Sequence, residues 1–287
     1  LISASDNCDP TLTYVQTPAA GTLVSGTQAV TIDVTDDAGN TTTCSFNVIV
    51  TDNTDPIITT CAPDVTELVN AACEFTLPDY TGLVVANDNC DLSLSYTQSP
   101  LAGTVIAGHG TVQNVVITVT DDNGNDTSCS FNVTLDDQID PTITCPADIA
   151  VDTDAGLCSA DVLASAPVYA DNCVVDAVSY TISGATTDAS ALTGINILGN
   201  TTFNIGTSTV TYIVTDIAGN TATCSFDVVV TDNEDPIVTC IGDQNVSADA
   251  ACMFTMADYI TMISASDNCD PTLTYVQTPA AGTLVSG

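Results

Sequence analysis

Short acidic segments that end in Asp-Pro carry the side chains of this sequence best suited to chemistry. They lie at residues 52–56, 136–141 and 232–236, and each also contains an amide side chain. Carboxylates, amides and backbone carbonyls are the oxygen ligands that Ca²⁺ takes, about six to eight at a time. The segments therefore predict calcium sites, and Ca²⁺ is the cofactor that we expect.

Two further oxygen-rich markers recur along the chain. The tripeptide Asp-Asn-Cys occurs at residues 6–8, 88–90, 171–173 and 267–269. The pattern Thr-Asp-x-x-Gly-Asn occurs at residues 35–40, 120–125 and 215–220, and a Cys follows each Asn by four residues. Recurrence of the same carboxylates and amides favours sites that are built once in every repeat.

The segments that must position these markers read as β-strands. After each Thr-Asp-x-x-Gly-Asn, apolar and polar residues alternate, as at residues 44–51. Period-two alternation is typical of a half-buried strand, and the turns are rich in Gly, Asn, Asp and Pro. No long amphipathic helical pattern appears, so the fold class is all-β. The predicted core residues are Phe46, Phe131, Val210, Tyr212, Ile213 and Phe226, with Tyr80 and Tyr259 as further packing residues.

In a β-sandwich the first strand and the two marker loops should lie at one pole, beside the acidic linker. The expected ligands are Asp52, Asn53, Asp55, Asp88, Asn89, Asp121, Asp122 and Asn125 in one cluster, Asp136, Asp137, Asp140, Asp171, Asn172, Asp216 and Asn220 in the next, and Asp232, Asn233 and Asp235 in the last. The alternative is that Asp and Asn at these places only form turns, which both residue types favour.

A long internal repeat sets the domain organisation. Residues 263–287 copy residues 2–26 letter for letter, at an offset of 261 residues. We therefore expect a window from a longer array that begins and ends partway through a unit. The expected division is a partial domain at 1–51, complete domains at 52–135 and 136–230, and a partial domain at 231–287 of the same type as 1–51. An additional run around residues 186–200 in the third domain is expected to be surface decoration.

Composition excludes several function classes. The chain has 36 acidic residues, no Lys and no Arg, which gives a formal net charge of −36. Nothing can neutralise a phosphate backbone, so nucleic-acid binding is excluded, and anionic membranes are disfavoured for the same reason. No apolar run is long enough for a membrane-spanning helix, so we expect no direct insertion in this window. The charge must be compensated by salt or by bound cations.

Thirteen Cys at recurring positions indicate disulfides and an extracytoplasmic location. Each complete domain holds four of them, and the sequence alone leaves three pairings open in each: Cys61, Cys73, Cys90 and Cys129, then Cys145, Cys158, Cys173 and Cys224. No CxxC spacing predicts zinc, and the single His109 is expected to be a loop residue. Repeated acidic markers do not make a catalytic pair, so we expect no enzyme.

The third domain carries a recognisable set of motifs. They are Asp140-Pro141, Cys145-Pro146, the run Phe203-Asn204-Ile205-Gly206-Thr207, Val210-Thr211-Tyr212 and Cys224-Ser225-Phe226. Together they resemble the hyalin repeat (HYR) family of extracellular Ig-like modules. The resemblance implies tandem Ig-like or fibronectin-like β-sandwich domains arranged end to end as a rod. The other domain types depart from the family pattern at residues 22–26 and 104–108, where the family favours Phe-x-x-Gly, and are expected to be divergent members.

The resemblance also implies a disulfide scheme. Simpler family members keep only the first and fourth Cys, which implies first-to-fourth pairing with the second and third Cys as an added bridge. The implied pairs are Cys61–Cys129 with Cys73–Cys90, Cys145–Cys224 with Cys158–Cys173, and Cys252–Cys269 in the last partial domain. The rival scheme pairs first with second and third with fourth, and it predicts Cys8–Cys44.

Taken together, these features predict a segment of an extracellular stalk or filament in a cell-surface adhesin, similar to the gliding-motility adhesins of flavobacteria. Its expected role is reach and mechanical continuity for attachment or gliding, in a secreted, outer-membrane-associated protein. The expected partners are further copies of the repeat in the same chain, and surface glycans or other cell-surface proteins. The alternative is a carbohydrate- or ligand-binding module of a secreted protein, which the absence of Trp disfavours.

Overall fold

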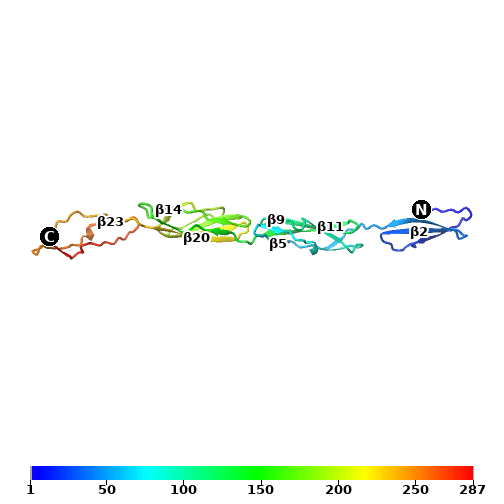
Figure 1. Ribbon diagram of the computed structural model, residues 1–287, viewed down its shortest axis with the longest axis horizontal. Helices are drawn as coiled ribbons and strands as arrows, with labels where there is room; N and C mark the ends of the chain where they lie inside the picture. The colour runs from blue at the N-terminus through cyan, green and yellow to red at the C-terminus, as the bar shows by residue number, and fades with distance from the viewer. Residues whose placement is uncertain (1, 287) are drawn as a thin grey trace. The chain divides into compact units, whose positions relative to one another are not determined.

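The protein is described by a computed structural model that covers residues 2–286, so residues 1 and 287, the outermost positions of the two expected partial domains, lie outside the description. The described residues are all-β, with two short 3₁₀ helices as their only helical elements (Figure 1). The chain divides into two compact units. One comprises Leu1–Thr66, Thr76–Ile106 and Val112–Thr134, and the other Glu67–Phe75, Ala107–Thr111 and Leu135–Gly287.

The first unit opens with a three-stranded antiparallel sheet of order β1-β2-β3. Its strands are β1 (Thr13–Thr17), β2 (Thr27–Thr35) and β3 (Thr41–Ile49). Val30 and Ile32 of β2 are buried, whereas every residue of β3 is exposed. Phe46, which was expected in the core, is therefore exposed. The alternation of β3 is correct, but no second layer covers its apolar face within this unit.

A more complete set of strands follows in sequence. These are β4 (Ile57–Thr60), β5 (Val65–Leu68), β6 (Glu74–Thr76), the 3₁₀ helix η1 (Thr81–Leu83), β7 (Val85–Asn87), β8 (Ser95–Ser99), β9 (Val105–Ala107), β10 (Val112–Thr120) and β11 (Asp126–Asp136). The sheet orders are β5-β11-β10-β8, β4-β7 and β6-β9. Here Phe131 is buried, and the Tyr80 ring packs edge-on against it with centroids 5.1 Å apart.

The second unit contains the largest sheet, of order β13-β20-β19-β16-β17. It is built from β13 (Ile149–Asp152), β16 (Val175–Gly184), β17 (Asp188–Ala189), β19 (Gly206–Asp216) and β20 (Thr221–Thr231). β13 runs parallel to β20, and the other pairings are antiparallel. Two smaller sheets join β14 (Ser159–Leu163) to β18 (Asn200–Asn204) and β12 (Thr142–Thr144) to β15 (Val168–Ala170).

Buried apolar residues of β14, of β18 and of the large sheet form one cluster. Phe203 comes from β18, Val210 and Tyr212 from β19, and Phe226 from β20. Burial alternates along β19, so Val210, Tyr212 and Val214 face the core. Ile213 points to the opposite face and is only half-buried, which corrects its place among the predicted core residues.

The rest of the second unit has little sheet. It contains β21 (Ile237–Thr239), β22 (Met253–Thr255), the 3₁₀ helix η2 (Ile260–Met262), β23 (Ser264–Ser266) and β24 (Leu284–Ser286). β21 pairs with β23, and β22 pairs with β24. Among residues 2–286, no helix is long and apolar enough to span a membrane.

The additional run around residues 186–200 is mostly exposed, as expected of surface decoration, but one of its residues reaches the core. Leu198 is buried, and its backbone N–H donates a 3.0 Å hydrogen bond to the Tyr212 hydroxyl, itself fully buried. Burial raises the pKa of the Tyr212 hydroxyl, and the hydrogen bond from Leu198 opposes that rise. The run therefore supplies both an apolar side chain and a donor to the interior.

Replacing Tyr212 with Phe is expected to destabilise this domain by about 1–3 kcal/mol, because the buried Leu198 N–H loses its acceptor. The matched control is Tyr180→Phe, since the Tyr180 ring packs edge-on against Tyr212 at 6.0 Å and is only half-buried. Urea unfolding of each variant measures the difference. Equal losses of unfolding free energy in the two variants would show that the Tyr212 hydroxyl contributes no more to stability than the Tyr180 hydroxyl does.

Candidate metal centres

Two trios of carboxylates form in the structure, one in each compact unit. Asp52, Asp88 and Asp121 form the first, and Asp137, Asp171 and Asp216 form the second. Within each trio, one oxygen of every carboxylate lies within 4.8 Å of the other two. The positions correspond: a linker Asp four residues before Pro, the Asp of Asp-Asn-Cys, and the Asp of Thr-Asp-x-x-Gly-Asn.

The turn between β19 and β20 presents Asp216. Gly219 takes a φ of 93°, a left-handed conformation that favours Gly, and closes the turn. Asn220 then donates to both carboxylate oxygens of Asp216, from its backbone N–H and its side chain, at 2.8 Å each. The same Asn220 amide donates to the Asp137 carbonyl at 3.1 Å. One amide thus ties the turn to the acidic linker.

The Asp-Asn-Cys loop presents the second carboxylate. Asp171 accepts a 2.8 Å hydrogen bond at Oδ2 from the Cys173 N–H, which fixes a tight Asx turn. Asn172 donates to Asp137 Oδ1 at 3.1 Å and to the Asn70 carbonyl at 3.3 Å. Linker and loop are therefore joined by side-chain hydrogen bonds as well as by proximity.

Several oxygens around the second trio are buried without a hydrogen-bond donor. Among the described residues, Asp137 Oδ2, Asp171 Oδ1 and Asn172 Oδ1 have none, and Asp137 is only 2% exposed. Buried polar atoms normally have partners, and grouped buried carboxylates repel one another. Because the chain has no Lys or Arg, no cationic side chain of either type exists to neutralise them. A bound cation with hard-oxygen preference fits this donor set.

The first trio repeats this construction. Asp121 accepts from the Asn125 N–H and side chain at 2.8 and 2.7 Å, and the Asn125 amide lies 3.3 Å from the Asp52 carbonyl. Asp88 Oδ1 accepts from the Cys90 N–H at 2.9 Å, while its Oδ2 is buried without a donor in the described structure. Burial acts to raise the pKa of Asp121, but hydrogen bonds from Asn125 and its neighbours outweigh it and hold that pKa below its ordinary value.

The charge of this trio also acts on a thiol. Desolvation, followed by the nearby carboxylates of Asp52, Asp88 and Asp91, raises the pKa of Cys90. The thiol form is therefore favoured at this position. The grouped ligand atoms at this site are the carboxylate oxygens of the trio.

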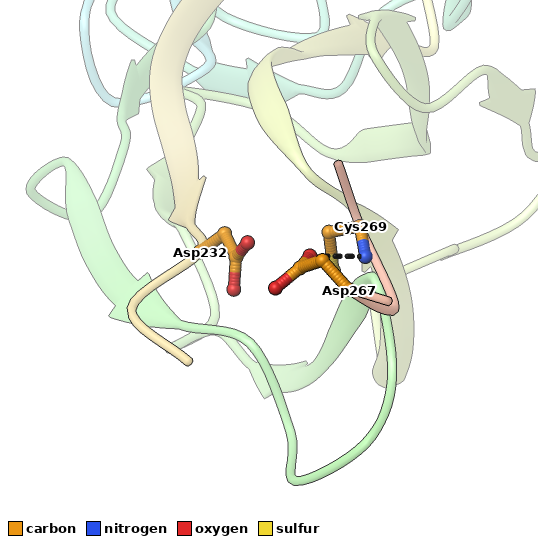
Figure 2. A group of neighbouring side chains, drawn as sticks. All are labelled: Asp232, Asp267 and Cys269. Atoms are coloured by element: carbon orange, nitrogen blue, oxygen red, sulfur yellow. Dashed lines mark hydrogen bonds between the residues drawn. The ribbon is translucent and has the colours of Figure 1, made fainter. Parts of the chain in front are cut away.

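A third group contains only two available carboxylates. Figure 2 shows Asp232, which follows β20, with its carboxylate directed toward that of Asp267. The Cys269 N–H donates to Asp267 at 2.8 Å, but the Cys269 sulfur is bonded to Cys158 and is not a free ligand. The position equivalent to Asp121 and Asp216 belongs to Asp36, which lies in the other compact unit.

Sequence reasoning omitted both Asp267 and Asp36 from the expected ligands. The signal was present, since each lies in a marker that contributes a carboxylate to the two complete trios. Hydrogen bonds from the Asn40 side chain and backbone hold the pKa of Asp36 below its ordinary value. The turn that presents this carboxylate is therefore already formed.

The other expected ligands support the trios or lie outside them. Asn53, Asp55, Asp140 and Asp235 are exposed. The Asp122 N–H donates to Asp91, Asn89 donates to the Cys90 sulfur, and Asn233 donates to Asp152. Asp136 lies 3.5 Å from His109 Nδ1, which also accepts a 3.1 Å hydrogen bond from the Asp137 N–H. His109 is thus a neighbour of the acidic linker.

Four disulfides are present. Cys61 bonds to Cys129 and Cys145 to Cys224, with Cα atoms 6.2 and 5.6 Å apart, and these are the first-to-fourth pairs that the resemblance implies. The rival pair Cys8–Cys44 does not form within the described residues, where both are free.

The expected bridges Cys73–Cys90, Cys158–Cys173 and Cys252–Cys269 are wrong. Cys73 bonds to Cys173 and Cys158 to Cys269, with Cα atoms 4.9 and 5.1 Å apart, whereas Cys90 and Cys252 are free. The reason is positional. Cys73 lies in a different compact unit from Cys90, in a turn whose Asn70 carbonyl receives the hydrogen bond from Asn172. The second Cys of one repeat therefore meets the Asp-Asn-Cys loop of the next.

Part of the chain matches a known domain family, and the chain is similar to two curated proteins. Residues 136–230 match the HYR domain. A hyalin from Strongylocentrotus purpuratus is 31% identical over 226 residues, covering 75% of this chain and 17% of that protein. A hyalin from Lytechinus variegatus is 27% identical over 252 residues, covering 84% and 44%. The chain thus spans less than half the length of either relative.

The chain also has low similarity to solved structures of cadherins. A protocadherin gammaB7 EC3-6 structure covers 79% of this chain and 62% of its own, at 14% identity and a TM-score of 0.33. Drosophila N-cadherin EC1-3 covers 74% and 80%, at 13% identity and a TM-score of 0.28. Residues 136–230 thus match an HYR domain, and the chain is similar to the two hyalins over most of its own length.

Proposed function

We propose that this chain is a segment of an extracellular adhesion-type protein, and that Ca²⁺ braces the joints between its domains. The proposed division is the one that the sequence predicts, at residues 1–51, 52–135, 136–230 and 231–287. Hyalin relatives, four disulfides and the absence of Lys and Arg support an extracellular array. The gliding and stalk roles, the rod arrangement and surface partners rest on the family resemblance alone.

The observation that carries the proposal is the composition of each trio. One carboxylate comes from the linker and two come from loops of the sandwich that follows it, as with Asp137 beside Asp171 and Asp216. When bound, Ca²⁺ would neutralise the three charges and accept the unpartnered oxygens as ligands. Asn172 and Asn220 already align linker and loops through hydrogen bonds to Asp137.

Neighbouring contacts at the same joint would act together with the ion. The Cys73–Cys173 disulfide and the Asn172 hydrogen bond to Asn70 join the turn that precedes the linker to the loop that follows it. Without the cation, repulsion among Asp137, Asp171 and Asp216 opposes this arrangement. The expected mechanical role is therefore a joint that stiffens when the cation binds. No enzymatic role is proposed.

Calcium titration of the full chain tests the proposal. Two Ca²⁺ ions are expected to bind, one for each complete trio, with dissociation constants of about 0.1–1 mM, the range of extracellular calcium modules. Small-angle X-ray scattering at saturating Ca²⁺ should show a longer maximum dimension than the same sample in excess chelator. Identical scattering curves, together with no saturable binding, would assign these Asp residues to turns alone.

A further inference from the structure

We propose that the Cys73–Cys173 disulfide is a second covalent connection between the domains at residues 52–135 and 136–230, in parallel with the linker that joins them. The two domains would then stay attached to each other after a protease cuts the linker. The inference rests on which peptide bonds each disulfide spans. It uses the proposed domain division and does not depend on calcium at the joints.

The linker is open to cleavage. β11 ends at Asp136 and β12 begins at Thr142, so residues 137–141 belong to no strand. Residues 138–140 are exposed. Exposed, irregular backbone is where proteases preferentially cut folded proteins. A cut in this segment separates the two domains unless a further covalent bond spans it.

The two disulfides within the domains do not span the linker. Cys61–Cys129 closes a loop that ends before it, and Cys145–Cys224 closes a loop that begins after it. The peptide bonds between residues 129 and 145 therefore lie outside both loops. If the other Cys had paired within their own domains, as Cys73–Cys90 and Cys158–Cys173, no disulfide would span these peptide bonds.

The observed pairing does span the linker. Cys73 precedes it and Cys173 follows it, at a sequence separation of 100 residues. Cys73 lies inside the Cys61–Cys129 loop and Cys173 inside the Cys145–Cys224 loop, so the three loops overlap. Every peptide bond from residue 61 to residue 224 is consequently inside at least one disulfide loop. Hydrolysis of any one of them adds one water and leaves two pieces that are still joined through sulfur.

Both Cys of this bridge are held by turns of their own. Cys73 has a φ of 59°, which is uncommon for a residue other than Gly, and its N–H donates to the Asn70 carbonyl at 2.9 Å. The Asn70 side chain accepts two more backbone N–H groups of the same turn, at 2.8 and 3.1 Å. The Cys173 N–H donates to Asp171 Oδ2 at 2.8 Å. The bridge therefore joins two ordered turns.

Hydrogen bonds at the joint would outlast a cut as well. Asn172 donates to Asp137 Oδ1 and Asn220 donates to the Asp137 carbonyl, each at 3.1 Å. A cut after residue 138 leaves Asp137 on one piece and both Asn residues on the other. Because the disulfide tethers the pieces, the contacts re-form at an effective concentration on the order of 1 mM or more. The cut joint is therefore expected to stay assembled.

The next joint repeats this arrangement. Cys158 bonds to Cys269 across the linker that contains Glu234. The side chain of Asn268 donates to the Leu157 carbonyl of the preceding turn at 3.2 Å and to Glu234 of the linker at 2.9 Å. The two turns differ in sequence, yet both are joined to the following Asp-Asn-Cys loop in the same way. This recurrence indicates that the second connection is a property of the joint.

Trypsin can test the proposal at the linker alone, because the chain has no Lys or Arg. Gln138→Arg places the only trypsin site at an exposed position of the linker. Free thiols are first alkylated to prevent disulfide exchange, and the full chain is digested in urea, so that cutting does not depend on the folded joint. We expect one full-length band on a non-reducing gel. A dithiol reductant should release residues 1–138 and 139–287 as two fragments.

The same digestion of Gln138→Arg combined with C73S and C173S should give the two fragments without a reductant. The matched control is Leu192→Arg combined with C73S and C173S. Leu192 is 78% exposed and lies inside the Cys145–Cys224 loop. This control should therefore be cut and still run as one band until it is reduced.

Two results would overturn the proposal. Fragments from Gln138→Arg without a reductant would show that no disulfide spans the linker. A single band from Gln138→Arg with C73S and C173S would show that some other bond is the second connection. The readout is the covalent mass of the cut chain, so the outcome is decided separately from the calcium titration.

Discussion

Replacing Asp137 with Asn is expected to weaken Ca²⁺ binding at the Asp137, Asp171 and Asp216 trio by about 100-fold. Loss of groups that only orient a metal ligand already lowers metal affinity about 10–100-fold, and Asp137 is placed as a ligand itself. The variant keeps the shape of the side chain and the acceptor oxygen for the Asn172 and Ile139 donors. The change is therefore confined to one negative charge and one hard-oxygen ligand.

The same variant should be more stable than the unchanged protein when no cation is bound. Three carboxylates whose oxygens lie within 4.8 Å of one another repel, and Asn removes two of the three repulsive pairs. A gain of about 1 kcal/mol in the free energy of unfolding corresponds to a rise in Tm of about 4–8 °C for a domain of this size. At Ca²⁺ concentrations that fill the trio only in the unchanged protein, the order should reverse, since the ion then stabilises that protein more than the variant.

Calorimetry in chelator and in Ca²⁺ measures this reversal. Asp140→Asn is the matched control, because it removes a charge from the same linker at an exposed position outside the trio. Asp140→Asn should leave the Ca²⁺ affinity nearly unaltered. Its effect on Tm should have the same sign in chelator and in Ca²⁺. If Asp137→Asn lowers Tm in chelator as well, the carboxylate is stabilised by its hydrogen bonds alone and the trio is not a cation site.

The sequence was a good guide to the elements and to the trios, because both depend on local rules. Period-two alternation predicted the strands around Phe131 and Phe226, and both side chains are buried. The three acidic markers predicted which loops would meet, and Asp52, Asp88 and Asp121 do meet. The turn at Gly219 and Asn220 also depends on local contacts, so it could be predicted without knowledge of the fold.

Three features could not be predicted in that way, because each depends on tertiary contacts. Phe46 has the sequence of a core residue and lacks a covering layer in its unit. Cys73 and Cys173 are separated by 100 residues, and only the packing of consecutive repeats brings them together. Leu198 lies in a run with one charged residue, Asp188, and no aromatic residue, and its contribution is a backbone N–H directed at Tyr212. Composition does not encode such placements.

Replacing Phe226 with Ala is expected to destabilise the domain formed by residues 136–230 by about 3–5 kcal/mol. Phe226 is 3% exposed and stacks on Tyr212 at 6.5 Å, so truncation leaves a cavity against a rigid ring. Leu163→Ala is the control: Leu163 is a 73% exposed residue of β14, where a change of about 0.5 kcal/mol or less is expected. Urea unfolding followed by circular dichroism measures both.

The core and the candidate metal centre are coupled through one strand, which makes this variant informative about function. Asp216 is the last residue of β19, and Tyr212 lies in the same strand. When the sandwich of Phe226→Ala unfolds, Asp216 separates from Asp137 and Asp171, whereas Asp52, Asp88 and Asp121 belong to the other unit. At a urea concentration between the two midpoints, Ca²⁺ titration should therefore count one site in Phe226→Ala and two in Leu163→Ala. Two sites in both variants would mean that Ca²⁺ binds linker residues without the folded loops, which contradicts a trio assembled by the sandwich.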